Sequence, residues 1–212
     1  MRIEVFSDVI CPWCFVGHAR LQQALAARSD RDIEVQWLPF ELNAAMPIAG
    51  RNRREYLIER LGRPDPFAAG QQQLLELGRS LGIDFDFEAI ERAPNTRRAH
   101  ALAAAAWRCS PPMQAKVVQA LFVAYFTEGR DVGDPAVLEK IGVEAGMPAE
   151  VAASALDDAD LHAEIVSLEA LAQRSQINGV PTFIFDRRTG FSGAQPLESF
   201  LQVIDALTVP AQ

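Results

Sequence analysis

Cysteine and histidine are scarce in this chain, and long apolar runs are missing. The 212 residues include three cysteines and three histidines. A structural zinc site usually needs four such ligands, arranged as two tight pairs, and the sequence contains one tight pair. No apolar run approaches the ~18–20 residues that a membrane-spanning helix needs. These shortages argue against a zinc-stabilised domain and against a membrane protein, and the 49% hydrophobic content is typical of a globular protein with a sizeable core.

Positive charge is also in short supply. The chain has 20 basic and 28 acidic residues, which gives a net charge of −8. A nucleic-acid partner would require a basic patch, so we expect none. Two basic clusters, Arg51/Arg53/Arg54 and Arg97/Arg98, have acidic residues near them, and we interpret both as solvated helix faces.

The N-terminus lacks the pattern of a secretory leader. It runs directly into the strand-like segment Ile3–Phe6 instead of a basic segment followed by a long apolar core and a cleavage site. We therefore expect a cytoplasmic protein. Disulfides in that compartment are rarely persistent, and a close cysteine pair there is more often transient and catalytic.

The pattern of apolar residues divides the chain into three parts. Residues 1–45 predict a β-α-β unit, with strands Ile3–Ser7 and Ile33–Leu38 and a helix over Phe15–Arg28. Residues 177–212 predict two strands, Pro181–Phe185 and Phe191–Gly193, and then the helix Pro196–Leu207. Residues 46–176 between them are rich in Ala, Leu, Glu and Gln. This order predicts the α/β fold class, with a thioredoxin-like fold (βαβ … ββα) interrupted by a large all-helical insertion. The helices expected in the insertion are Arg53–Leu61, Pro66–Leu81, Thr96–Cys109, Met113–Thr127, Pro135–Ala145, Pro148–Ala155 and Asp160–Ser175.

The most informative motif is Cys11-Pro12-Trp13-Cys14, at the junction of the first strand and the first helix. Free N–H groups and the helix dipole at a helix start favour a thiolate at Cys11. Cys14, one turn later, is placed to attack a mixed disulfide formed by Cys11. Pro12 suits the first helical position because its missing N–H costs nothing there.

Other interpretations of the pair remain open from the residues alone. Cys11, Cys14 and His18 would form a partial site for a soft metal, or the two thiols would be inert. A CxxC beside a βαβ pattern favours the redox interpretation.

The second motif is Gly179-Val180-Pro181-Thr182. A proline opens a strand readily because it cannot donate to the ladder, and an X–Pro bond adopts the cis form at little cost. In thioredoxin folds a cis-proline at this place lies beside the CxxC, and the backbone before it pairs with an extended substrate. We expect Val180 and Pro181, with Pro12 and Trp13, to contact substrate; an ordinary loop proline is the alternative.

Three further residues carry specific expectations. Glu4 alternates with Ile3 and Val5 and is a candidate proton relay beneath Cys14, or else an exposed carboxylate. Cys109 is expected to be a small buried hydrophobic residue. Trp13 supplies no imidazole cation to stabilise a Cys11 thiolate, so we expect a couple less oxidising than the roughly −120 mV end of the range.

Several blocks of the sequence resemble the DsbA family of thioredoxin-fold oxidoreductases, in its cytoplasmic FrnE-like branch. They are Ser7–Gly17, Asn95–His100, Phe122–Phe126, Asp131–Val132, Gly179–Phe183 and Ser192–Pro196. The resemblance implies dithiol–disulfide exchange with Cys11 as nucleophile and Cys14 as resolving cysteine, and a helical insertion that caps the active site. It implies protein or small-molecule thiols and disulfides as partners, no cofactor beyond the Cys11–Cys14 disulfide, no metal, and a homodimer as one option.

The same blocks are similar to 2-hydroxychromene-2-carboxylate isomerases and kappa-class glutathione transferases, which have a serine at the reactive position. This resemblance keeps a glutathione-dependent isomerase or transferase open as the alternative function, and glutathione as a co-substrate. Asn95, Thr96 and His100 would then line its pocket; otherwise they are a helix cap and a helix-face histidine.

Overall fold

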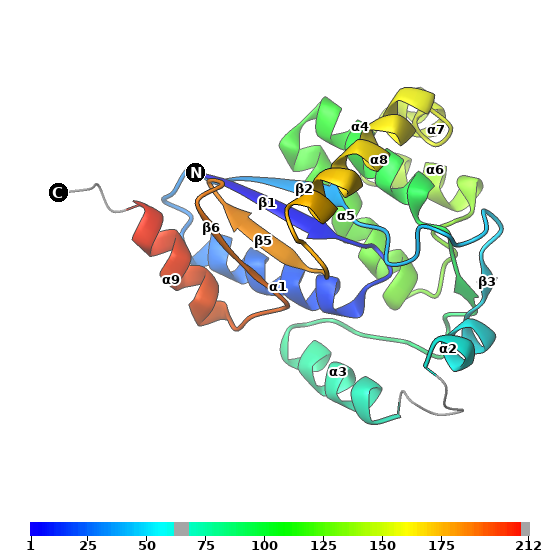
Figure 1. Cartoon of the computed structure of the whole chain (residues 1–212), viewed down its shortest axis with the longest axis horizontal. Coiled ribbons are helices and arrows are strands. Elements are labelled where there is room, and N and C mark those ends of the chain that lie inside the picture. Colours follow the sequence, from blue (N-terminus) through cyan, green and yellow to red (C-terminus); the bar gives the residue numbers. More distant parts are fainter. Residues whose placement is uncertain (62–67, 209–212) are drawn as a thin grey trace.

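The computed structural model describes residues 1–61 and 68–208, and within them strands frame a long run of helices (Figure 1). The strands and helices, in chain order, are β1 (Arg2–Ser7), α1 (Pro12–Ala27), β2 (Glu34–Pro39), β3 (Arg51–Asn52), α2 (Arg53–Leu61), α3 (Ala68–Ser80), β4 (Arg92–Ala93), α4 (Arg97–Cys109), α5 (Pro111–Phe126), α6 (Pro135–Glu144), α7 (Ala149–Ala155), α8 (Ala159–Arg174), β5 (Thr182–Phe185), β6 (Thr189–Ser192) and α9 (Leu197–Thr208). None of these helices is long and apolar enough to cross a membrane.

The main sheet joins the two ends of the chain. Its strand order is β2-β1-β5-β6, with β1 parallel to β2 and antiparallel to β5. Val5 pairs with Trp37 on one side and with Phe183 on the other. β1 is flanked by partner strands on both edges, and its side chains are buried along almost its whole length because helices cover both faces of the sheet. The strand that leads into Cys11 is therefore held in the centre of the sheet.

Each face of the sheet is covered by different helices. Alternate side chains of a strand point to opposite faces. Ile3 and Val5 belong to the large core cluster, which also contains residues of α1 and α9. Phe6 belongs to a smaller cluster with Leu38 of β2 and Ala172 of α8. Figure 1 shows α1 and α9 on one side of the sheet and α8 on the other.

The sequence predicted an all-helical insertion, but the insertion also contains two short strands. Two short strands pair antiparallel within it, with Arg51 opposite Ala93 and Asn52 opposite Arg92. Gly50 enters this ladder with a φ of 65°, and an added Cβ would come within 2.7 Å of the Ala93 carbonyl oxygen. Strands of two residues have no alternation to recognise, which is why the sequence pattern missed them.

Among the described residues, helix boundaries agree with the predictions within two residues except at the start of α1, and prolines mark the two helices that begin early. α1 begins at Pro12 and α5 at Pro111, each earlier than expected. Proline fits the first helical turn, and the Ser110 hydroxyl caps α5 by accepting from the Met113 N–H. The expected helix over 66–81 is observed from Ala68, and residues 66 and 67 lie outside the described residues.

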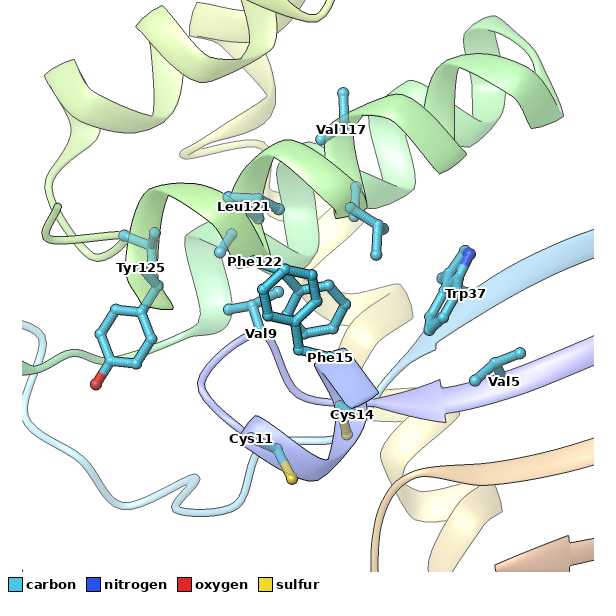
Figure 2. Packing of buried hydrophobic residues seen from close by; sticks show 14 of the residues in the cluster. Val5, Val9, Cys11, Cys14, Phe15, Trp37, Val117, Leu121, Phe122 and Tyr125 are labelled. Carbon is cyan, nitrogen blue, oxygen red and sulfur yellow. The ribbon is translucent and has the colours of Figure 1, made fainter. Parts of the chain in front are cut away.

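A single apolar core runs through all three predicted parts of the chain. The Phe15 ring of α1 stacks on Phe122 of α5 at 5.1 Å and meets the edge of Phe85 at 5.7 Å. Figure 2 shows Phe15 and Phe122 close together above the start of α1. The same cluster includes Phe183 of β5. The insertion thus packs directly on the helix that carries the cysteine pair.

Candidate active site

The cysteine pair lies where the central strand passes into α1. Cys11 is the N-cap of the helix, with an extended backbone (φ −93°, ψ 114°), and Pro12 occupies the first turn. The Cys11 N–H donates to the Asp8 carbonyl at 3.1 Å, and the Cys14 N–H donates to the Cys11 carbonyl at 3.0 Å. Both thiols are free and buried, and the Cys14 side chain is completely enclosed. Helix geometry therefore places the two sulfurs on one side, as Figure 2 shows.

The second motif meets the first across 169 residues of sequence. The Val180–Pro181 peptide bond is cis. The Cys11 thiol donates a hydrogen bond to the Val180 carbonyl, with sulfur and oxygen 3.8 Å apart. The ladder between β1 and β5 begins only at Thr182, so Val180 and Pro181 precede the paired segment. The structure thus brings Cys11, Val180 and Pro181 together, with Trp13 beside them on the surface, 37% exposed.

The surroundings of Cys14 keep its proton on the sulfur. Burial is the main reason that the pKa of Cys14 is raised well above its ordinary value, and the nearby Cys11 thiol adds to the rise. The Ser7 side chain and the Asp8 backbone offset part of this shift by lowering the pKa. Cys14 is therefore a neutral thiol at pH 7 and needs a proton acceptor before it can attack.

Glu4 does not lie beneath Cys14, where a proton relay would have to be. It pairs with Arg187, with Oε1 2.7 Å from Nη2 and Oε2 3.1 Å from Nε. It shares the α8 face of the sheet with Phe6, whereas Val5 faces α1. Neighbouring residues of a strand point to opposite faces of the sheet. The position of Glu4 on the α8 face therefore does not support its predicted role as a proton relay for Cys14.

His18 lies in the core behind the cysteines. Its ring is 5.0 Å from the Trp37 ring and 5.7 Å from the Phe122 ring. Burial lowers the pKa of His18 to about 4, so the imidazole is neutral at pH 7. Among the described residues, no three His, Cys, Asp or Glu side chains are grouped to hold a metal ion. The geometry therefore gives no support to a soft-metal site of Cys11, Cys14 and His18.

The three candidate pocket residues of α4 do not converge on one cavity. Asn95 accepts from the Arg97 N–H at 3.0 Å and donates to the Met46 carbonyl at 2.8 Å, at the rim of a surface hollow. Thr96 is buried as the N-cap residue, without a capping bond from its side chain. His100 lies deeper, with Nε2 3.5 Å from Asp8 Oδ1. The structure thus joins only His100 to the segment that carries the cysteines.

Two other expectations about single residues are wrong. Cys109 is exposed at the end of α4 instead of buried. The helical pattern could not place it, because the last turn of a helix often extends past the core. Arg53 is half-buried and not part of a solvated face, since its Nη1 donates to the Phe87 carbonyl at 3.1 Å.

A cavity of about 200 Å³ lies beside the motif, and the sequence pattern did not predict it. Its walls come from the motif segment, the loop after β2, and the insertion, so no short segment signals it. The lining residues are Ile10, Pro12, Leu42, Arg53, Tyr56, Leu57, Gln71, Leu74, Phe87, Ala93, Tyr125 and Phe126. Pro12 connects this apolar cavity to Cys11.

A family model for the DSBA-like thioredoxin domain matches residues 2–205. The chain belongs to this family. A solved relative, a probable DsbA oxidoreductase from Streptomyces coelicolor, is 30% identical over 100% of this chain and 93% of its own, with a TM-score of 0.88. An uncharacterized Bacillus subtilis protein, YwbO, is 27% identical over 87% of this chain and 86% of its own length. The family thus confirms the thioredoxin-like fold and the DsbA resemblance.

More distant DSBA-like structures share the fold. The cytosolic disulfide reductase DsbM from Pseudomonas aeruginosa, solved with GSH, is 19% identical, covers 98% of both chains and has a TM-score of 0.68. A 2-hydroxychromene-2-carboxylate isomerase is 14% identical over 98% of this chain and 96% of its own, with a TM-score of 0.73. Both functional classes considered from the sequence are therefore built on this fold.

Proposed function

We propose that this protein is a thiol–disulfide oxidoreductase of the FrnE-like type that cycles the Cys11–Cys14 pair. The observation that carries the proposal is the meeting of the two motifs. Cys11 caps α1 and faces the carbonyl before a cis-proline, and Cys14 lies enclosed behind it. The chain belongs to the DSBA-like thioredoxin family, and its relative at 30% identity is a probable DsbA oxidoreductase.

The exchange proceeds in two balanced steps. The Cys11 thiolate attacks one sulfur of a substrate disulfide, and a mixed disulfide forms as the other substrate sulfur leaves and takes up a proton. Cys14 then loses its proton and attacks the Cys11 sulfur. This step forms the Cys11–Cys14 disulfide and releases the second substrate thiol. The substrate gains two electrons and the protein loses two; in the reverse direction the protein oxidises a dithiol.

Substrate contacts come from both motifs. The Val180 backbone precedes the paired part of β5, where an extended peptide would bind as an extra strand. Trp13 offers an exposed aromatic surface, and the cavity beside Pro12 accepts an apolar group. Protein disulfides and small disulfides are both substrates under this proposal. Glutathione is the proposed reductant and the cytoplasm the proposed compartment, in keeping with the DsbM relative that is cytosolic and solved with GSH.

The second candidate is a glutathione-dependent isomerase that uses the same pocket without net redox turnover. The fold shared with the 2-hydroxychromene-2-carboxylate isomerase favours including it. A cysteine at both ends of the motif favours the redox function, because only that function needs the second thiol.

The deciding experiment is a measurement of the reduction potential of the pair. The protein is equilibrated with glutathione buffers of different ratios, and free thiols are trapped and counted. We expect a two-electron midpoint that disappears in Cys14→Ser, with loss of insulin-disulfide reduction. A wild-type protein that forms no Cys11–Cys14 disulfide at any ratio would overturn the proposal. Isomerase activity that survives in Cys14→Ser would favour the second candidate.

A further inference from the structure

A small cavity lies between the ends of β1 and β2 and the helices α4, α5 and α8. Its volume is about 30 Å³, and Ser7, Trp37, His100 and Gln114 are among its lining residues. A water molecule needs roughly 10–15 Å³ of such volume and two to four polar partners. The cavity is therefore large enough for one or two water molecules.

Three buried polar atoms on residues that line this cavity lack partners. Ser7 Oγ, Trp37 Nε1 and His100 Nε2 have no hydrogen bond to any described protein group. Buried polar groups are almost always hydrogen-bonded, to protein or to ordered water. Three such atoms around one small space indicate that water completes their hydrogen bonds.

Ser7 connects this cavity to Cys14. Along β1, Ile3 and Val5 face α1, and Ser7 is the next residue on that face. The Ser7 side chain is close enough to Cys14 to lower its pKa. Among the described residues of this strand, Ser7 is thus the one polar side chain on the side of the buried thiol.

His100 connects the cavity to a buried carboxylate. His100 Nε2 is 3.5 Å from Asp8 Oδ1, and the Asp8 side chain is fully buried. Asp8 Oδ2 accepts from the Leu42 N–H at 2.7 Å, which fixes the carboxylate in place. Two glutamates of α8 also lie near His100. Glu164 lines the cavity, and Glu169 interacts electrostatically with the imidazole. The His100 ring thus has carboxylates of Asp8, Glu164 and Glu169 around it.

We propose that Ser7, water in this cavity, and His100 carry the proton away from Cys14 during the resolving step. The inference rests on the proposed function. In this path the proton of Cys14 moves to the Ser7 hydroxyl, and the hydroxyl passes its own proton through water to His100 Nε2. The Cys14 thiolate attacks Cys11 as the bond to the substrate sulfur breaks. The imidazolium beside Asp8 then releases the proton to solvent, and the departing substrate thiolate takes up a proton from solvent. Ser7 and His100 are thus positioning and proton-transfer residues for Cys14.

The test measures the two steps of exchange separately. In Cys14→Ser, the rate of mixed-disulfide formation reports the Cys11 attack alone. In proteins with both cysteines, rapid acid quenching reports how fast the mixed disulfide is resolved, and each rate is measured across pH. We expect Ser7→Ala to slow resolution at pH 7 by about tenfold and to move its pH midpoint upward, because a lost hydrogen bond leaves less Cys14 thiolate. The Cys11 attack should stay within about twofold of the wild-type rate, since Ser7 does not contact it.

Three further variants distinguish proton transfer from a structural effect. Ser7→Thr keeps the hydroxyl and should restore the wild-type pH profile. His100→Gln should slow resolution in the same way as Ser7→Ala. Trp37→Phe removes the third unpartnered atom but leaves Ser7 and His100 in place, and should leave the pH profile unchanged. In the Cys11→Ser background, the ultraviolet absorbance of the Cys14 thiolate gives an independent titration if resolution cannot be timed.

The outcomes separate this inference from the proposed function. If Ser7→Ala resolves as fast as wild type with the same pH midpoint, the inference is wrong and the redox function stands. If Ser7→Thr fails to rescue, the effect is structural and the inference is also wrong. If the wild-type protein forms no mixed disulfide, the proposed function fails and the inference fails with it.

Discussion

At the scale of single residues, Trp13 lies two positions after Cys11, the proposed nucleophile. It is exposed beside Cys11 and carries no positive charge. Trp13→His would place an imidazole there whose protonated form stabilises the Cys11 thiolate, and a better-stabilised reduced form raises the reduction potential. We expect a rise of about 30 mV or more, the equivalent of roughly 1.4 kcal/mol.

Equilibration with glutathione buffers measures this change. Trp13→Phe is the matched control, because it keeps an aromatic ring without a titrating group, and its potential should stay close to that of wild type. An unchanged or lower potential in Trp13→His would show that the helix terminus, and not residue 13, controls the thiolate.

His18 makes stability depend on pH. Its folded pKa is about 4 because of burial, whereas an exposed histidine titrates near 6.5. Between these values the unfolded chain binds more protons, so stability is present above the unfolded pKa and is lost as pH falls toward 4. From pH 7 to pH 5 we expect a loss of about 2 kcal/mol from this residue. Urea unfolding at both pH values measures this loss of stability. His18→Phe should remove most of the pH dependence. An equally steep dependence in the variant would show that His18 is not its cause.

At the scale of elements, α1 and the cis-proline segment are in close contact at Gly17. A Cβ at this position would lie 3.0 Å from both the Pro181 Cγ and the Phe183 ring. We expect Gly17→Ala to lower the free energy of unfolding by about 1 kcal/mol, because crowding outweighs the gain in helix propensity. Activity should fall as well, since Pro181 must move relative to Cys11.

Gly70 provides the matched control for that substitution. It lies exposed in α3, and an added Cβ would meet nothing within 4 Å. Gly70→Ala should therefore stabilise the protein by up to about 1 kcal/mol and leave activity unchanged. A Gly17→Ala protein with wild-type activity would show that the contact does not position Pro181.

The sequence predicted the helix boundaries well where capping residues and glycines mark the ends of the helices. Asp134 caps α6 with its side chain, and Gly82, Gly129 and Gly146 have positive φ values at helix ends. The site was harder to predict, because it depends on which face a side chain takes. Glu4 and Val5 both fit a buried strand, and no local pattern shows which of them faces α1. His100 was a candidate for a glutathione pocket, yet its position beside Asp8 depends on how α4 packs against the loop after β1.

At the scale of the whole molecule, the continuous core links the insertion to the thioredoxin-like part. The predicted boundaries near 45 and 177 are crossed by one cluster that holds Phe15, Phe122 and Phe183. We therefore expect one cooperative unfolding transition, although chains above about 150 residues often populate intermediates.

Urea titrations followed by two probes measure this cooperativity. Tryptophan fluorescence reports the surroundings of Trp13, Trp37 and Trp107, and far-ultraviolet circular dichroism reports the helices, most of which lie in the insertion. The two curves should coincide. A separate, earlier transition in the helical signal would show that the insertion is an independent domain.

The wide separation of Cys11 and Val180 along the chain has a consequence during synthesis. The cysteines leave the ribosome early, but the strand that completes the sheet beside them is among the last segments made. At about 5–20 residues per second, the 169 residues between the two motifs take on the order of 10–30 s to translate. Throughout that interval the growing polypeptide displays two reactive thiols without their enclosing wall. The nascent chain thus meets the cell's oxidants and electrophiles before its active site exists.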